Sequence, residues 1–127
     1  MAIKFHNPKS VSLAGKYSLG AEVPQGARLF YVSGQVGVDS KGKLQAGIEK
    51  QVEQVWKNIR EVLKSAGMTF ADVAKVNVFL TDSRFIPTYR SVRDQFISEP
   101  YPASTLLVVA GLADPAMLVE VEVVAAK

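Results

Sequence analysis

Cysteine is missing from this 127-residue chain, and histidine occurs once, at His6. Without cysteine there can be no disulfide framework, no thiolate nucleophile and no zinc-thiolate site, and one histidine cannot form a histidine metal cluster. We therefore expect neither a metal site nor a bound cofactor. His6 itself is expected in a mobile or edge segment, and we assign no chemistry to it.

Long hydrophobic runs are also absent. The N-terminal residues lack the apolar stretch of about 7–15 residues that a secretory signal contains, and no later segment approaches the roughly 18 uninterrupted apolar residues of a membrane span. We therefore expect no membrane association and a cytoplasmic protein.

Charge of one sign does not cluster along the chain. The net charge is +3, and lysines and arginines stand among acidic residues, whereas nucleic-acid binding favours a basic stripe with stacking aromatic side chains. We expect a solvated surface and no nucleic-acid partner. The hydrophobic content of 48% is that of a globular protein, and the length predicts a single domain over residues 1–127.

Two short segments near the N-terminus, residues 16–23 and 28–33, are rich in β-branched and aromatic residues. They are separated by Pro24-Gln25-Gly26-Ala27, which has the composition of a turn. The pair therefore predicts a β-hairpin.

The middle of the chain carries the clearest helical pattern. From Val52 to Ala66 the apolar residues follow the three-and-four spacing of one helix face, with Trp56 near its centre. Gly67 would end this helix as a left-handed cap. A second helix is expected to begin near Pro87, because the first turn of a helix tolerates proline.

Three further segments predict strands, at residues 75–81, 105–110 and 117–125. The predicted order is ββαβαββ, an α+β fold with two helices on one face of the sheet. Residues 106–110 are apolar at every position, so both faces of that strand need cover. Because two helices cover one face, we expect another copy of the chain to cover the other.

Two glycine-containing segments are candidates for anion binding. Residues 37–43 follow the spacing of a phosphate-binding loop, but Leu44 stands where that loop requires Ser or Thr, and a hairpin turn is the better interpretation. Ser33-Gly34-Gln35 ends a strand, where glycine lets a ligand approach free backbone N–H groups. A β-bulge explains the same tripeptide, and both interpretations stay open.

Glu120 and Glu122 alternate with valines in the last predicted strand, so both carboxylates point to the same side. Two acids on a solvated face are one interpretation. If self-association covers that face, burial and mutual repulsion would raise a carboxyl pKa enough for proton transfer near neutral pH.

Several motifs stand in a fixed order along almost the whole chain. They are Tyr17-Ser18, Val32-Ser33-Gly34-Gln35, residues 51–67, Asp72-Val73, Val78-Phe79-Leu80-Thr81-Asp82, Pro102-Ala103 and Leu118-Val119-Glu120-Val121-Glu122. Together these motifs resemble the reactive intermediate deaminase family, RidA/YjgF.

The resemblance implies a chorismate-mutase-like α+β fold, a homotrimer and ligand clefts between subunits. In imine-hydrolysing members an arginine after the Pro-Ala pair grips the carboxylate of a 2-aminoacrylate-type enamine or imine, and a late glutamate places or activates water. Carried to this chain, the resemblance implies Glu120 as the catalytic residue. The implied substrate-binding residues are Tyr17, Ser33, Gly34, Gln35 and Ser104.

Ser104 departs from the pattern, because it stands where the arginine is expected. An arginine offers a charged, planar, two-point grip, whereas a serine hydroxyl offers one neutral hydrogen bond. Tyr89 likewise replaces an asparagine usual in the second helix, and Leu106 stands where many members have a small polar residue or cysteine. We expect negligible activity on alanine- or serine-derived imines such as 2-aminoacrylate.

Two functions stay open. The first is a hydrolytic enamine or imine deaminase with a different substrate. The second is a non-catalytic trimer that binds a small metabolite, either uncharged or held by another cation such as Arg28, Arg90 or Arg93. Ribonuclease activity, proposed for some members of the family, has little support without a catalytic histidine pair.

Overall fold

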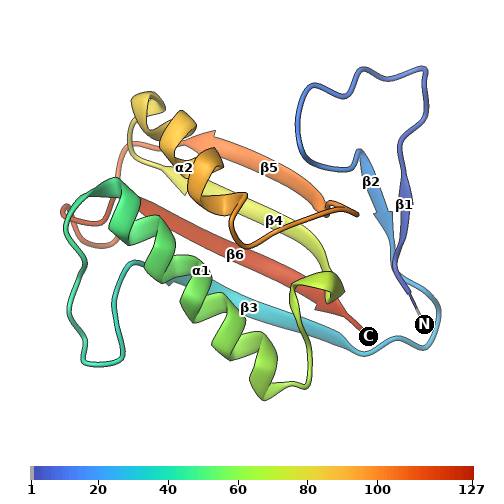
Figure 1. The fold of residues 1–127 in the computed structure, drawn as a ribbon, viewed down its shortest axis with the longest axis horizontal. Coiled ribbons are helices and arrows are strands. Elements are labelled where there is room, and N and C mark those ends of the chain that lie inside the picture. The colour runs from blue at the N-terminus through green and yellow to red at the C-terminus, as the bar shows by residue number, and fades with distance from the viewer. Residues whose placement is uncertain (1) are drawn as a thin grey trace.

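A four-stranded sheet carries both helices on one of its faces (Figure 1). The computed structural model describes residues 2–127. The elements are β1 (Lys4–His6), β2 (Gly20–Glu22), β3 (Leu29–Val36), α1 (Gly47–Ser65), η1 (Phe70–Asp72), β4 (Val73–Leu80), η2 (Ser83–Phe85), α2 (Ile86–Arg93), β5 (Ala103–Val108) and β6 (Val119–Ala126). The predicted α+β class is confirmed. None of the helices within residues 2–127 has the length and apolarity to cross a membrane.

The strand order in the main sheet is β3-β6-β4-β5. β4 and β5 are parallel, and α2 forms the crossover between them, whereas β6 runs antiparallel between β3 and β4. The last strand of the chain thus becomes a central strand. β5 lies at one edge of the sheet and β3 at the other.

The predicted hairpin of residues 16–23 with 28–33 is wrong. β2 pairs with β1, whereas β3 pairs with β6. The turn between them does form, since the Ala27 N–H donates to the Pro24 carbonyl at 3.2 Å and Gly26 has φ 83°. A turn with positive φ only at its third residue is of type II, and such turns splay the flanking strands instead of pairing them.

The N-terminal pairing adds one strand to the predicted ββαβαββ order. His6 lies in the short β1–β2 ribbon, opposite Gly20, and its Nε2 is 2.9 Å from Glu22 Oε1. This ribbon lies beside the main sheet and is not part of it (Figure 1). The expectation of an edge segment for His6 is therefore met.

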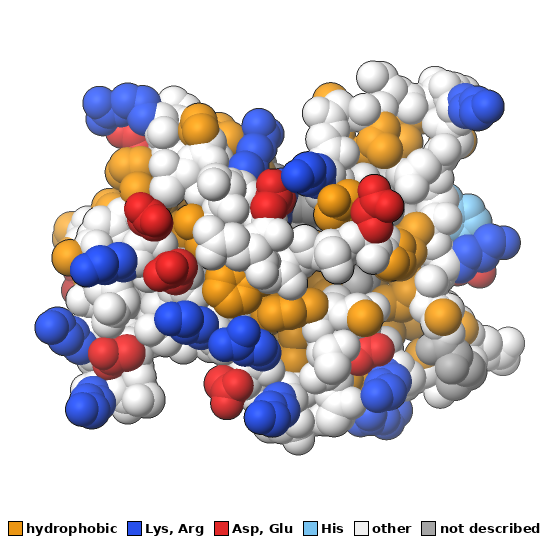
Figure 2. Space-filling view, viewed as in Figure 1, with side chains coloured by type: hydrophobic (Ala, Val, Ile, Leu, Met, Phe, Trp, Pro, Cys, Tyr) orange, Lys and Arg blue, Asp and Glu red, His pale blue; other side chains and the backbone are white. Residues whose placement is uncertain are grey.

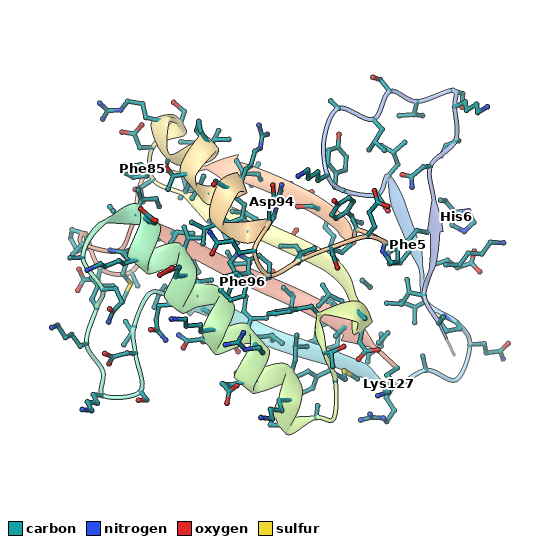
Figure 3. All side chains as sticks on the ribbon, in the orientation of Figure 1. Phe5, His6, Phe85, Asp94, Phe96 and Lys127 are labelled. Atoms are coloured by element: carbon teal, nitrogen blue, oxygen red, sulfur yellow. The ribbon has the colours of Figure 1, made fainter. Side chains whose placement is uncertain are left out.

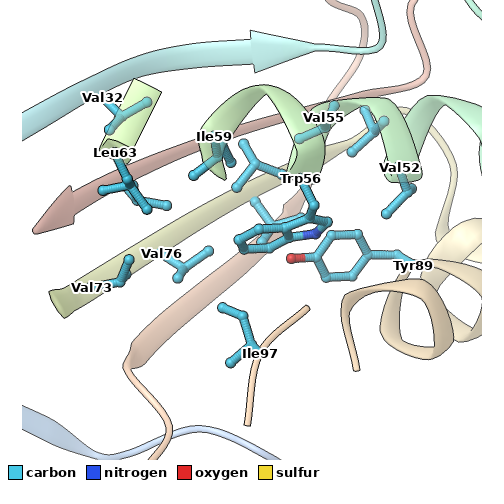
Figure 4. Close-up of a cluster of buried hydrophobic side chains, with 14 of the residues drawn as sticks. Val32, Val52, Val55, Trp56, Ile59, Leu63, Val73, Val76, Tyr89 and Ile97 are labelled. Atoms are coloured by element: carbon cyan, nitrogen blue, oxygen red, sulfur yellow. The ribbon is translucent and has the colours of Figure 1, made fainter. Parts of the chain in front are cut away.

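Helix α1 covers the sheet with the apolar face predicted from the sequence. The buried side chains of this face include Val52, Val55, Trp56, Ile59 and Leu63 (Figure 4). The helix starts at Gly47, earlier than predicted. The sequence pattern did not reveal its first turn, because that turn is mostly exposed and has no apolar periodicity. Gly67 has φ 71° and its N–H donates to the Lys64 carbonyl, so the predicted glycine cap is confirmed.

Acidic and basic side chains are interspersed over the exposed surface of α1 (Figure 2). The opposite face of the sheet differs. Tyr31 on β3 is 70% exposed and Leu107 on β5 is 51% exposed. Along β6 the valines at 119, 121 and 123 are buried toward the helices, and Glu120 and Glu122 lie on the other face, as predicted.

Candidate functional site

A cleft of about 460 Å³ opens between the segment before β2, helix α2 with the residue after it, and strand β5. The residues that line it are Ala14, Gly15, Lys16 and Tyr17 from the N-terminal segment, Tyr89, Arg90, Arg93 and Asp94 from α2 and its end, and Ser104 and Leu106 from β5. Figure 3 shows Asp94 at the end of α2 that faces the N-terminal segment. The cleft thus combines hydroxyl groups, charged side chains and an apolar floor.

Ser18 holds the N-terminal wall of this cleft in place. It is buried, its N–H donates to the Pro102 carbonyl at 3.0 Å, and its hydroxyl donates to the Tyr101 carbonyl at 2.6 Å. The backbone therefore bridges to Ala103 at the start of β5. This pairing brings Tyr17 and Ser104, two predicted substrate-binding residues, to the same cleft.

Asp94 ties the two walls together. Its Oδ1 accepts hydrogen bonds from Arg93 Nε at 3.2 Å and Nη2 at 2.9 Å, and its Oδ2 accepts one from Lys16 Nζ at 3.0 Å. Partial burial acts to raise the pKa of Asp94, but the hydrogen bonds and charges of Lys16 and Arg93 outweigh it, and the pKa lies below its usual value. Asp94 is thus ionised at neutral pH.

Tyr89 forms the inner part of the α2 wall. It is 1% exposed, and neither its hydroxyl nor Trp56 Nε1 has a hydrogen-bond partner within residues 2–127. Figure 4 shows the hydroxyl directed toward the Trp56 indole. Burial raises the pKa of Tyr89 far above its usual value, so the hydroxyl stays neutral. The guanidinium of Arg93 lies 5.9 Å from the centre of the Tyr89 ring.

Glu120 and Gly34 meet on the face of the sheet away from the helices. Glu120 pairs with Val36 on β3 and with Phe79 on β4. A Cβ atom on Gly34 would overlap Glu120 Oε2 and lie 2.8 Å from its Cδ. The carboxylate therefore rests on bare backbone, which only glycine provides at this point.

Ser33, Gly34 and Gln35 form a β-bulge. The pairing of β3 with β6 shifts register between Val32 and Gln35, so this interpretation of the tripeptide is confirmed. Ser33 is exposed, and Gln35 Nε2 donates to the Ser33 carbonyl at 3.1 Å. The bulge lets the chain present Gly34 to Glu120. Glu122, two residues farther along, instead accepts a hydrogen bond from Asn77 Nδ2 at 3.2 Å.

The predicted site residues fall into two groups on opposite faces of the sheet. Ser104 pairs with Val76, which is buried toward the helices. Phe79 lies three residues farther along β4, so it and its partner Glu120 point to the other face. Within one chain, Tyr17 and Ser104 therefore do not meet Gly34 and Glu120.

Arg90 and Arg93 line the cleft, whereas the third arginine considered from the sequence does not. Arg28 donates from Nη2 to the Ala66 carbonyl at 3.3 Å, at the end of α1. Lys16 and Asp94 are cleft residues that the sequence reasoning missed. The position of Lys16 next to Tyr17 was the one signal that could have found them.

The glycine-rich segment 37–43 is a turn, as its sequence predicted. Val38 bridges to Leu44, and Asp39 Oδ1 accepts hydrogen bonds from the N–H groups of Lys41 at 2.9 Å and Lys43 at 3.0 Å. The hydrogen bond from Lys43 is the largest of the effects that lower the pKa of Asp39. The carboxylate of Asp39 thus accepts from the backbone N–H groups that a phosphate-binding turn would offer to its ligand.

A second cleft, of about 640 Å³, adjoins the first and shares Gly15, Lys16 and Tyr17 with it. Phe5, Leu13 and Tyr101 give it an apolar lining. Neither cleft has metal-binding chemistry: among residues 2–127, no group of three or more His, Asp or Glu side chains is placed to hold a metal ion.

The sequence and the fold both match known proteins. Residues 8–127 match the family model described as Endoribonuclease L-PSP. The 2-iminobutanoate/2-iminopropanoate deaminase of Homo sapiens is 34% identical over 119 residues, which cover 92% of this chain and 84% of that protein.

Two crystal structures share the fold over nearly all of their length. The RidA protein of the Antarctic bacterium Psychrobacter sp. PAMC 21119 is 34% identical, with a TM-score of 0.74 over 95% of this chain and 96% of that one. YyfB from Yersinia pestis, a Rid family protein of unknown function, is 25% identical, with a TM-score of 0.89 over 100% of both chains. The chain therefore belongs to the RidA/YjgF family, as its motifs predicted.

Proposed function

We propose that this protein is a hydrolytic imine or enamine deaminase that works as a homotrimer, with its substrate bound in clefts between subunits. The observation that carries the proposal is the carboxylate of Glu120, which lies against the bare backbone of Gly34 on the uncovered face of the sheet. Its similarity to the 2-iminobutanoate/2-iminopropanoate deaminase of Homo sapiens supports the reaction class.

Self-association is supported by the separation of the two groups of site residues. Tyr17 and Ser104 line a cleft on the helix side, and Glu120 lies on the opposite face of the same sheet. A complete site would therefore need a second copy of the chain. The exposed Tyr31 and Leu107 provide apolar contacts for such an interface.

Imine hydrolysis requires little of the protein beyond placing water and moving protons. As the water oxygen bonds to the imine carbon and the C=N π bond opens, Glu120 takes one water proton and passes it to the nitrogen, which gives a carbinolamine. Glu120 then takes the hydroxyl proton and delivers it to the nitrogen as the C–N bond breaks and the C=O bond forms. Ammonia and an oxo acid leave. Ser33, Gly34 and Gln35 from the bulge, with the hydroxyls of Tyr17 and Ser104, bind the substrate. No metal or cofactor takes part in this scheme.

The preferred substrate in this proposal is an imine with an apolar side chain larger than methyl. Leu106 gives the first cleft an apolar floor, and Phe5, Leu13 and Tyr101 line the adjoining one. We expect efficient hydrolysis of the leucine-derived imine and negligible hydrolysis of alanine- or serine-derived imines, because only the larger apolar side chain would contact this lining and add to binding where no arginine stands at position 104.

The variant Glu120→Gln tests the catalytic role. It keeps the shape of the side chain and removes the base, so we expect kcat on the leucine-derived imine to fall about 100-fold or more while product binding is kept. Oxo-acid release from an amino-acid oxidase reaction measures this. Glu122→Gln is the matched control, because Glu122 lies on the same strand and face and bonds Asn77. Equal activity of Glu120→Gln and the unaltered protein would refute the role.

The same variant separates catalysis from simple binding. If the unaltered protein hydrolyses no imine in a broad panel but is thermally stabilised by an oxo acid, the protein is the non-catalytic binding trimer instead. If turnover is present and is lost only in Glu120→Gln, the binding-only function is excluded.

A further inference from the structure

Arg90 differs from the other cations of the first cleft because it has no ion pair with an acidic side chain among the described residues. Its side chain is exposed and lines the cleft. The ion pairs found among residues 2–127 engage His6, Lys16, Arg84 and Arg93, and none of them involves Arg90. Its guanidinium is therefore available to a ligand.

The neighbouring cations, Arg93 and Lys16, both form ion pairs with Asp94. Arg93 uses Nε and Nη2 on Asp94 and lies over the Tyr89 ring, and its side chain is 15% exposed. Lys16 binds the other oxygen of Asp94. The cleft thus contains one carboxylate and three cationic side chains, and Arg90 is the cation without an ion pair among the residues that the structure describes.

We propose that Arg90 is the residue that binds the carboxylate of the ligand, in the role that an arginine at position 104 would otherwise fill. This inference rests on the proposed function for the identity of the ligand. A guanidinium fork matches a carboxylate with two parallel hydrogen bonds. Ser104 and Tyr17, which line the same cleft, then supply neutral hydrogen bonds to the rest of the ligand.

The network around Asp94 positions this cation. Arg90 and Arg93 lie one helical turn apart on α2, so they share a face of the helix. Asp94 and Lys16 lock that face to the N-terminal wall. Because Asp94 is satisfied by Lys16 and Arg93, it does not compete with a ligand for Arg90.

Calorimetric titration with 4-methyl-2-oxopentanoate, the oxo acid expected from the leucine-derived imine, tests the proposal. The unaltered protein should bind this acid and should not bind 4-methyl-2-pentanone, which carries a methyl group in place of the carboxylate. Arg90→Gln should raise the Kd about tenfold or more, since 1.4 kcal/mol corresponds to one tenfold step. Arg84→Gln is the matched control, because Arg84 is exposed beside the same helix and pairs with Asp82 outside the cleft. Its Kd should be unchanged.

Introducing an arginine at position 104 on β5 gives a second test of the proposal. The double variant Arg90→Gln with Ser104→Arg should regain binding of 4-methyl-2-oxopentanoate to within about threefold of the unaltered protein, because the guanidinium returns to the same cleft. Arg90→Lys should bind with intermediate affinity. If the acid fails to bind the unaltered protein, or if folded Arg90→Gln binds it as tightly, the role of Arg90 is refuted.

The outcomes separate this inference from the proposed reaction. Binding of the acid through Arg90 without turnover of any imine would contradict the hydrolase and keep the anion site. Turnover that depends on Glu120 but is unchanged in Arg90→Gln would keep the hydrolase and contradict the anion site.

Discussion

A single missing side chain at Gly34 allows the carboxylate of Glu120 to lie against β3. A Cβ atom there would overlap Glu120 Oε2, and the β-bulge brings the two residues into contact. Glycine is often explained by unusual backbone angles, but Gly34 has no positive φ. Its role is to leave space.

The variant Gly34→Ala should therefore displace Glu120. We expect a loss of about 1–3 kcal/mol in unfolding free energy, because the added methyl group overpacks the contact. We also expect kcat for imine hydrolysis to fall about tenfold or more, since 1.36 kcal/mol of transition-state stabilisation corresponds to tenfold in rate. Denaturant unfolding and oxo-acid release measure the two effects.

Gly111→Ala is the control for this substitution. A Cβ on Gly111 meets nothing within 4 Å, and its φ is not positive. Its unfolding free energy should change by less than about 0.5 kcal/mol. If Gly34→Ala behaves like Gly111→Ala in both assays, Gly34 does not position Glu120.

Among the elements, α1 is anchored by one buried polar side chain in its first turns. Gln51 Oε1 accepts a hydrogen bond from the Leu118 N–H at 2.9 Å, and Nε2 donates to the carbonyls of Gln45 and Ala116, each at 3.1 Å. The start of the helix is thus joined to the segment that leads into β6, the strand that carries Glu120.

Replacing Gln51 with leucine keeps the size of the side chain and removes these hydrogen bonds. Because buried backbone groups would lose their partners, we expect a loss of about 1–3 kcal/mol in unfolding free energy. Gln54→Leu is the control, since Gln54 is half-buried and bonds only the Asn58 side chain within residues 2–127. A smaller effect for Gln51→Leu than for Gln54→Leu would contradict this interpretation.

The helices and the last strand could be predicted from the sequence because their patterns are local. The spacing of Val52 to Leu63 and the valines around Glu120 each define a buried face without reference to the rest of the chain. The partner of β2 could not be predicted in this way. Turn composition at residues 24–27 does not show whether a turn pairs or splays its strands, and β1 is too short to show a pattern.

At the scale of the whole molecule, the chain has one face covered by helices and one with exposed apolar side chains. Tyr31 and Leu107 lie on that second face, together with Glu120 and Glu122. The doubly apolar segment 106–110 signalled this need for cover in the sequence. A proposed homotrimer would bury the face and would bring Glu120 close to a neighbour's cleft.

Association is tested by Tyr31→Glu. A carboxylate placed on this face should break the proposed homotrimer, because burying an unpaired charge is costly. We expect the unaltered protein to sediment as a trimer at micromolar concentration, and Tyr31→Glu to sediment as a folded monomer without imine hydrolysis. Lys57→Glu, an exposed position on α1, is the control and should remain trimeric. An unaltered protein that sediments as a monomer would refute the assembly.

The sequence by itself determined the family, the helices and the alternation along β6, because short-range periodicity and motif order are written directly in the chain. Only the tertiary structure decided that Tyr17 and Ser104 share one cleft, and that Glu120 lies on the opposite face of the sheet. It also placed Arg90 and Arg93 in the cleft and Arg28 outside it. These relations depend on the order of the strands and on the register of β5 and β6 against β4, which sets the face of the sheet on which each side chain lies. Both are set by contacts between residues far apart in the sequence, and such contacts leave no local sequence pattern.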